Sequence, residues 1–224
     1  AEKITPEAIN FMSRYGRGLI CLALDPPIVE KLGLKQMVQD NRSLYKTAFT
    51  VSIAAAQGMR SGMGAADRAH TVLTAVRDDA VPEDLIQPGF VFPLRARRGG
   101  VLFRTGQTEG SVDLARLAGF KPATVICGIM KDDGSMARLP DLKEFAREHD
   151  IKIASVADVI SYRMRTESFV QRGAETTLRT PYGDFRAIAF VNDIDEYEHM
   201  ALVKGDVGSD MDVLVRVHSG CLTG

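Results

Sequence analysis

Apolar residues follow a helical period in some segments of the chain and a strand-like pattern in others. Ala65, Ala69, Val72 and Val76 put one apolar face on a helix expected over 64–77. By the same criteria, we expect further helices over 6–15, 28–32, 111–117, 140–149 and 156–162. We expect strands over 19–24, 48–53, 90–94, 124–130 and 151–155, and a second short strand directly after 99–100. The first part of the chain therefore mixes helices and strands.

The pattern changes after Arg163. The range 164–175 has no clear period and is interpreted as a linker between a mixed domain over 1–163 and an incomplete β segment over 176–224. We expect this tail to be the less stable part, because its strands leave unpaired edges. In the tail, alternation predicts strands over 176–178, 185–191, 199–204 and 213–217.

In the mixed domain, the strand 124–130 is continuously apolar, so we expect it to be buried on both faces.

The stretch 88–110 carries the most specific candidate chemistry. Arg104, Gly106 and Thr108 stand just before an expected helix. Glycine lets the backbone approach a ligand, the first helical N–H groups are unpaired, and arginine and threonine add donors. These residues are either an anion-binding turn or a plain strand–loop–helix connection with a surface arginine.

Composition narrows the class of protein. The 224 residues are 45% hydrophobic and 25% charged with a net charge of −1, which is typical of a globular protein without a general basic surface for nucleic acid. No apolar run approaches the roughly 20 residues of a membrane helix, and no signal peptide is recognised. Cys21, Cys127 and Cys221 lie far apart, which favours a reducing cytoplasm over a disulfide scaffold.

The motif PG-x-VFPLRA-x-x-GGVL-x-R-x-G-x-TE over 88–109, with TPEAINFM, GLICL, TAFTVSI, AADRA and DDGSMARLPDL elsewhere in order, resembles 3,4-dihydroxy-2-butanone 4-phosphate synthase. The resemblance covers most of 1–163 and implies an α+β fold with a mixed sheet and helices. It also implies a riboflavin-pathway lyase that converts ribulose 5-phosphate to the butanone phosphate and formate. Magnesium or manganese, a homodimer and a phosphorylated sugar are the implied cofactors and partners, with neither nucleic acid nor membrane.

The tail resembles the opening of GTP cyclohydrolase II through YGDFRA, ALVKGD and RVHS followed by CLTG, and the two families occur fused in this order. Lys204, Arg216 and His218 are substrate-side residues by this resemblance and plain turn and strand residues otherwise. Cys221 would be the first of three zinc ligands. Both ends of the chain look cut, and the lyase family's acidic segment before Ala1 is missing. We therefore expect no tightly held zinc and no GTP ring opening.

Three positions depart from the lyase family. Phe90 and Gln107 stand where the resemblance implies histidines, the second a metal ligand, and Gly128 stands where it implies a glutamate. Arg60 and Ser61 begin a segment that is usually richer in hydroxyl groups. These changes predict a catalytically degenerate lyase domain with weak or absent magnesium or manganese binding, Gln107 being at most a weak ligand.

Two alternatives remain open. The chain is a working metal-dependent lyase with substituted ligands, for which His70 is the nearby imidazole, or a binder of phosphorylated metabolites without turnover. The resemblance assigns phosphate binding to Arg104, Gly106 and Thr108. Tyr45 and Cys21 are possible substrate contacts, although Cys21 also fits a small buried strand residue.

Overall fold

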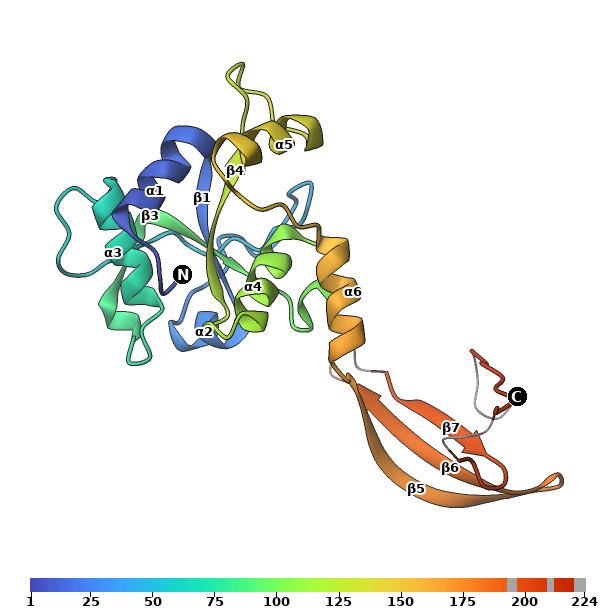
Figure 1. Cartoon of the computed structure of the whole chain (residues 1–224). Coiled ribbons are helices and arrows are strands. Elements are labelled where there is room, and N and C mark those ends of the chain that lie inside the picture. The colour runs from blue at the N-terminus through green and yellow to red at the C-terminus, as the bar shows by residue number, and fades with distance from the viewer. Residues whose placement is uncertain (193–196, 209–211, 220–224) are drawn as a thin grey trace. The chain divides into compact units, whose positions relative to one another are not determined.

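The computed structural model describes residues 1–192, 197–208 and 212–219 (Figure 1). The chain divides into two compact units, Ala1–Glu167 and Ser168–Gly224, and each is described by itself. Among the described residues, no helix combines the length and the apolar character needed to cross a membrane.

A four-stranded mixed sheet forms the centre of the first unit, in the order β2-β3-β1-β4. β1 (Arg17–Leu24) runs parallel to β3 (Leu85–Arg95) and antiparallel to β4 (Ala123–Ile129). The short β2 (Ile53–Ala55) pairs with the other side of β3. A mixed sheet with helices confirms the α+β fold class.

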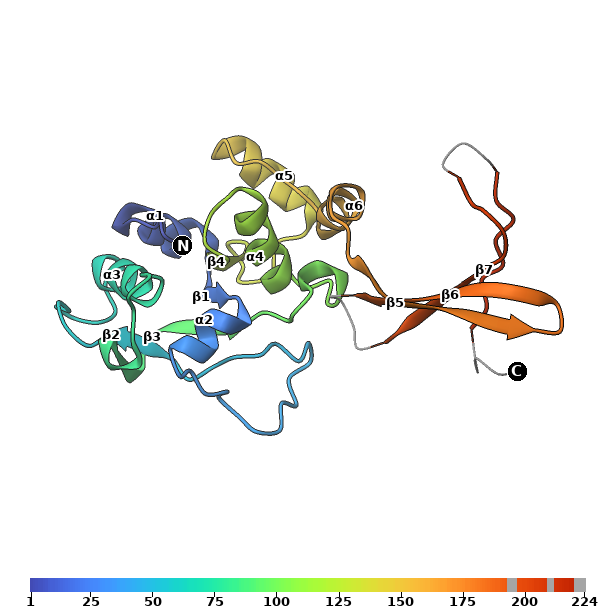
Figure 2. The ribbon, with the colours of Figure 1, turned by 90° about the horizontal axis from the view of Figure 1, so that it is seen from below.

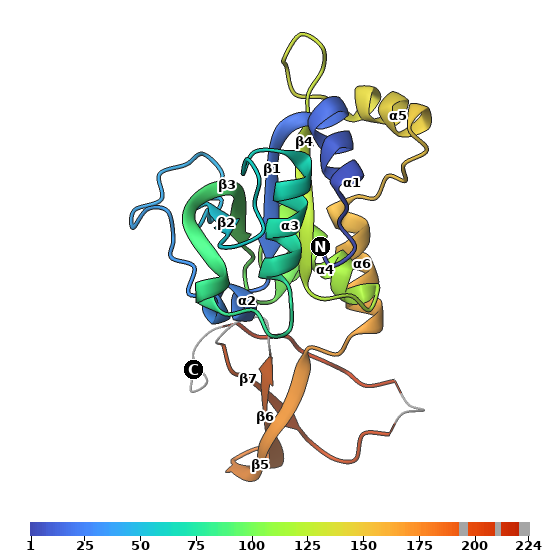
Figure 3. The ribbon, with the colours of Figure 1, turned by 90° about the vertical axis from the view of Figure 1, so that its left-hand side faces the viewer.

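Helices cover both faces of this sheet (Figures 2 and 3). On one face α1 and α3 pack around Ile9, Ile20 and Ala69, and on the other face Val112 of α4 packs against Ala23. Because side chains alternate along a strand, Ile20 and Ala23 of β1 serve opposite layers. The helices are α1 Pro6–Phe11, continued by a π-helical turn over Met12–Gly16, α2 Pro26–Lys31, α3 Ala65–Ala75, α4 Gln107–Leu117, α5 Leu139–Glu148 and α6 Val156–Thr166, with 3-10 turns at Pro82–Asp84 and Gly100–Leu102.

The strand expected directly after 99–100 is instead the 3-10 turn Gly100–Leu102. Gly99 and Gly100 have φ values of 79° and 62°, a left-handed region that glycine adopts without strain and that turns the chain here. The next N–H, that of Val101, donates to Asp113 Oδ2 at 2.8 Å. A side chain therefore takes the hydrogen bond that a neighbouring strand would have accepted.

Two further strand expectations are wrong. The segment 151–155 is irregular and exposed, because no described strand pairs with its alternating residues. β4 is only partly buried beyond Ala123, whereas burial on both faces was expected. It is an edge strand, so the helices on the two faces cover it incompletely.

The second unit is an antiparallel sheet of β5 (Val170–Thr180), β6 (Gly183–Asn192) and β7 (His199–Val203), in that order. α6 ends, and β5 begins, inside the range expected as a linker, so 167–169 alone separate them. The sequence shows no period at the start of β5 because β5 is almost wholly exposed and is formed by pairing with β6.

Little of the second unit is buried. Ala187 and Ile188 on β6 are its buried apolar residues among those described. The strand expected over 213–217 is irregular. The lower stability of this unit stays a prediction, and so small a core is its physical basis.

Candidate functional site

Two buried carboxylates on α4 bind the backbone of the loop that precedes this helix. Glu109 and Asp113 are each 1% exposed and lie one turn apart on the same helical face. Glu109 Oε1 accepts from the Arg97 N–H at 3.0 Å, and Asp113 Oδ2 accepts from the Val101 N–H at 2.8 Å. The acceptors are four residues apart and so are the donors, so this pair, the α4 clamp, holds the loop alongside the helix.

The guanidinium of Arg104 joins the α4 clamp to a second loop. Its Nη1 donates to Glu109 Oε2 at 2.6 Å, and its Nη2 donates to the carbonyl oxygen of Tyr45 at 3.0 Å. Gly106 is required between them, because a Cβ there would overlap Arg104 Nη1 and lie 2.5 Å from Glu109 Oε2. The structure thus brings three predicted residues together, with Tyr45 acting through its backbone while its side chain is exposed.

Arg104, Gly106 and Thr108 form what we call the anion turn. α4 begins at Gln107, and Gly106 before it has no side chain to cap the first-turn N–H groups. These N–H groups and the Arg104 guanidinium are the donors that an anion would meet. Thr108 is buried, and Gln107 is exposed. Phosphate binding at the anion turn stays a prediction.

The three substituted positions have different surroundings. Cys127 packs into the core on the α1 and α3 side, so strand alternation directs its neighbour Gly128 towards α4, the helix that Gln107 begins. The Phe90 ring belongs to an irregular part of β3 and lies against Gly62 of the loop before α3. An aromatic ring, a bare backbone and a neutral amide occupy these positions in place of ionisable groups.

The substituted positions offer few ligands to a divalent metal ion, and weak or absent magnesium or manganese binding stays a prediction. Magnesium takes oxygen ligands, including carboxylates, and Gln107 offers one neutral oxygen. In the part of the chain that the structure describes, no three His, Cys, Asp or Glu side chains gather closely enough to hold a metal ion. Cys221, the expected zinc position, lies outside the described residues, so its role stays a prediction.

Asp67, in the first turn of α3, organises the preceding loop. Its carboxylate accepts from the N–H groups of Arg60, Ser61 and Gly62 at 3.0, 2.6 and 2.7 Å, and from the Ser61 hydroxyl at 3.1 Å. These hydrogen bonds, that from the Ser61 N–H foremost, lower the pKa of Asp67 to about 2. A Cβ on Gly62 would lie 2.7 Å from Phe90 Cε2, so the loop is fixed against the Phe90 ring.

The lowered pKa of Asp67 predicts a pH-dependent stability. The unfolded carboxyl titrates near 3.8, so the unfolded state binds the proton more readily. The stabilisation is complete above about pH 5 and is lost as the pH falls from about 4 to about 2. Urea unfolding of the wild type and Asp67→Asn should differ most near neutral pH and converge at about pH 2. The exposed Asp79→Asn is the control, and a pH-independent difference for Asp67→Asn would contradict this account.

Cys21 and His70 each have a local structural environment. Cys21 is buried on β1, and burial, followed by the nearby Cys127, raises the pKa of its thiol to about 11. The thiol is therefore protonated at neutral pH, which favours the interpretation as a small buried residue. His70 Nε2 lies 3.0 Å from the carbonyl oxygen of Gln57, and a Cβ on Gly58 would meet this ring. A substrate contact by Cys21 stays a prediction.

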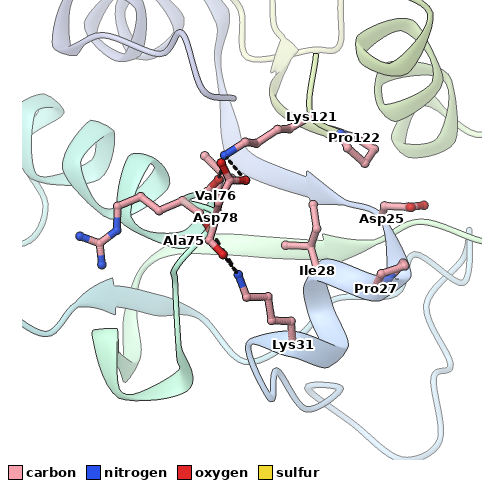
Figure 4. Close-up of a pocket in the computed structure, with 10 residues that line it drawn as sticks. Asp25, Pro27, Ile28, Lys31, Ala75, Val76, Asp78, Lys121 and Pro122 are labelled. Atoms are coloured by element: carbon pink, nitrogen blue, oxygen red, sulfur yellow. Dashed lines mark hydrogen bonds and ion pairs between the residues drawn. The ribbon is translucent and has the colours of Figure 1, made fainter. Parts of the chain in front are cut away.

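A cleft between α2, the end of α3 and the segment before β4 contains none of the predicted site residues (Figure 4). Lys31 Nζ donates to the carbonyl oxygen of Asp78 at 2.5 Å. Lys121 Nζ donates to the carbonyl oxygen of Val76 at 2.8 Å and pairs with the Asp78 carboxylate at 2.8 Å. Both ammonium groups thus satisfy carbonyls at the C-terminal end of α3, so we interpret this cleft as a structural joint.

Sequence reasoning missed the α4 clamp and the residue behind it, Arg163. The available signal was the spacing of Glu109 and Asp113, two acids four residues apart on the helix face that also carries Val112. An acid on an apolar helix face needs a buried partner. The partners here are backbone N–H groups and distant arginines, which the sequence does not identify.

Comparisons with known proteins identify the families that the two parts of the chain match. Residues 1–162 match the family model of 3,4-dihydroxy-2-butanone 4-phosphate synthase, and residues 171–224 match that of GTP cyclohydrolase II. A Neisseria meningitidis serogroup B protein named 3,4-dihydroxy-2-butanone 4-phosphate synthase is 53% identical over 97% of this chain and 60% of its own length. The Aquifex aeolicus riboflavin biosynthesis protein RibBA is 54% identical over 100% of this chain and 56% of its own length. The chain thus spans under two thirds of these relatives.

Solved structures show the same similarity. RibBX, a two-domain 3,4-dihydroxy-2-butanone 4-phosphate synthase from A. baumannii, matches with a TM-score of 0.81 and 46% identity over 90% of this chain and 60% of that one. A 3,4-dihydroxy-2-butanone 4-phosphate synthase in complex with two magnesium ions matches with a TM-score of 0.70 and 38% identity over 74% and 82%. These proteins are named as synthases, which gives no support to a loss of activity. By family model, identity and fold, this chain belongs to the 3,4-dihydroxy-2-butanone 4-phosphate synthase family and continues into the beginning of a GTP cyclohydrolase II sequence.

Proposed function

We propose that this chain is a riboflavin-biosynthesis module that binds a phosphorylated sugar without performing the lyase reaction. The observation that carries the proposal is the replacement of three ionisable groups by Phe90, Gln107 and Gly128. The mixed domain 1–163 is the binding module, and 176–224 is the start of a separate cyclohydrolase-like domain.

The loss of chemistry follows from the roles that the reaction requires. Conversion of ribulose 5-phosphate to the butanone phosphate and formate moves several protons, which needs groups that exchange protons near neutral pH. A divalent metal would polarise the carbonyl and hydroxyl oxygens. Phenylalanine and glycine can do neither, and the Gln107 amide is a weak ligand. Magnesium or manganese is therefore held weakly or not at all.

The anion turn supports retained phosphate binding. Glu109 and Tyr45 take one N–H each in the described contacts of Arg104, whereas a guanidinium carries five. The Arg104 side chain is 28% exposed, and the first turn of α4 adds N–H donors beside it. A guanidinium next to a helix N-terminus binds phosphate without a catalytic partner.

Phosphate binding is tested by Arg104→Gln. In the wild type, ribulose 5-phosphate should shift the amide resonances of Gly106 and Thr108 in a nuclear magnetic resonance titration. Arg104→Gln should weaken this binding by about tenfold or more, because a charge-assisted hydrogen bond is lost. Arg98→Gln, which removes the same charge from an exposed position in the same loop, should leave it within about twofold. Equal shifts in wild type and Arg104→Gln would make the turn a mere connector.

We propose a homodimer as the assembly. Support comes from Leu19, Met136 and Leu139, large apolar side chains that are 52%, 50% and 56% exposed on β1, beyond edge strand β4 and on α5. Where exposed apolar side chains form a contiguous patch, they are typical of association surfaces. Sedimentation equilibrium decides between one chain of 24.5 kDa and twice that mass.

A further inference from the structure

The α4 clamp is itself held by a buried arginine on α6, the helix that lies alongside α4 (Figure 2). Arg163 is 6% exposed. Its Nη1 donates to Asp113 Oδ2 at 2.8 Å and to the carbonyl oxygen of Gly99 at 2.9 Å. Its Nε and Nη2 donate to the carboxylate of Glu167 at 3.0 and 2.8 Å. One guanidinium thus connects α6, α4 and the loop before α4.

Two of these contacts act on the loop that leads to Arg104. Asp113 Oδ2 receives both the Arg163 guanidinium and the Val101 N–H, so the cation and the backbone meet on one oxygen. The Gly99 carbonyl is a second fixed point, two residues before Val101. A turn anchored at both points has little freedom to rotate, and it delivers the chain directly to Arg104.

Arg116 allows the positioning effect of Arg163 to be distinguished from its charge. Its Nη1 also pairs with Asp113, at Oδ1 and 3.0 Å, but its side chain is 45% exposed, and its other described partner is Asp25, which lies outside the loop. Without Arg163, the Asp113 carboxylate still keeps a cation. The loss of Arg163 therefore removes the tie between α6 and the loop more than it removes charge compensation.

We propose that Arg163 is a positioning residue for the anion turn: by fixing Gly99 and Asp113, it sets where the Arg104 guanidinium is presented to a phosphate group. This inference rests on the proposed phosphate binding. The planar fork of a guanidinium serves acceptors in several directions at once, whereas an ammonium group is a single point. Arg163→Lys should therefore restore only part of what Arg163→Gln loses.

The test uses the full chain and inorganic phosphate at constant ionic strength, followed by amide resonances. Arg163→Gln should shift the Val101 and Gly106 amides before phosphate is added. It should also weaken phosphate binding by about tenfold, the scale of effect expected when a binding group is displaced by a fraction of an ångström. Arg163→Lys should fall between Arg163→Gln and the wild type.

Two matched variants separate positioning from stability. Arg116→Gln removes the other cation of Asp113 and should leave phosphate binding within about twofold. Val159→Ala removes buried packing from α6 without removing a polar contact, so it should lower the free energy of unfolding and keep the phosphate affinity. If Val159→Ala weakened phosphate binding as much as Arg163→Gln, Arg163 would be structural only and the inference would be overturned.

A second measurement does not depend on phosphate. If the wild type shows no phosphate-induced shifts, the proposed phosphate binding fails, and hydrogen exchange of the Arg97 and Val101 amides decides the positioning role. Arg163→Gln should speed this exchange, and Arg116→Gln should leave it unchanged. Unchanged exchange in Arg163→Gln would show that Arg163 does not hold the loop.

Discussion

Incubation of this chain with ribulose 5-phosphate and magnesium is expected to release no formate above a protein-free control. Phe90 and Gly128 cannot exchange a proton, and Gln107 cannot replace a charged or imidazole metal ligand. Addition of the acidic N-terminal segment that the resemblance to the lyase family implies is expected to leave the activity absent, since it restores none of these three groups.

The gain-of-function arm combines that segment with Phe90→His, Gln107→His and Gly128→Glu. Space permits the changes: a Cβ on Gly128 would lie 3.4 Å from the flexible end of Met136, and Gln107 is exposed. Because one positioned acid or base contributes about 10²-fold or more, restored formate release should exceed the parent by at least about that factor.

Addition of Arg104→Gln to the restored chain is the matched control and should remove the gain. Formate release by the unmodified chain at a rate comparable with the restored one would show that substituted ligands still work, and it would end the proposal of lost lyase chemistry.

Gly89→Ala is expected to cost about 3 kcal/mol or more in the free energy of unfolding, which is a large share of the stability of a typical domain. A Cβ at this position would overlap the backbone of Ile53 and the N atom of Ala54, where β2 meets β3. Backbone atoms in a sheet cannot rotate aside as a side chain does, so the two strands must separate. The Gly89 N–H, which donates to Ser52 Oγ at 3.1 Å, would move with them.

Urea unfolding monitored by circular dichroism measures this effect. Gly110→Ala is the matched control: a Cβ there would make an ordinary contact of 3.4 Å with Val156 Cγ2, and alanine in a helix is favoured over glycine by up to about 1 kcal/mol. It should be neutral or stabilising. A Gly89→Ala protein that unfolds at the wild-type urea concentration would show that β2 and β3 adjust more freely than their spacing indicates.

The sequence alone determined the family, the mixed α+β fold and most helices and strands of the first unit. Periodic apolar faces such as that of α3 and continuous runs such as β1 are local properties, so they can be read without knowledge of neighbours. The positions on which the proposed loss of chemistry rests were identifiable for the same reason: Phe90, Gln107 and Gly128 stand in ordered motifs, and an absent ionisable group is visible in the residue type itself.

Only the tertiary structure decided what surrounds the anion turn. Glu109, Asp113 and Arg163 come from two helices about fifty residues apart in sequence, and their partners are backbone groups without a sequence signature. The 3-10 turn after Gly99, the partial exposure of β4 and the isolation of 151–155 likewise depend on which partner is near. Hydrogen bonds and burial are relations between distant groups, whereas periodicity reports on one segment at a time.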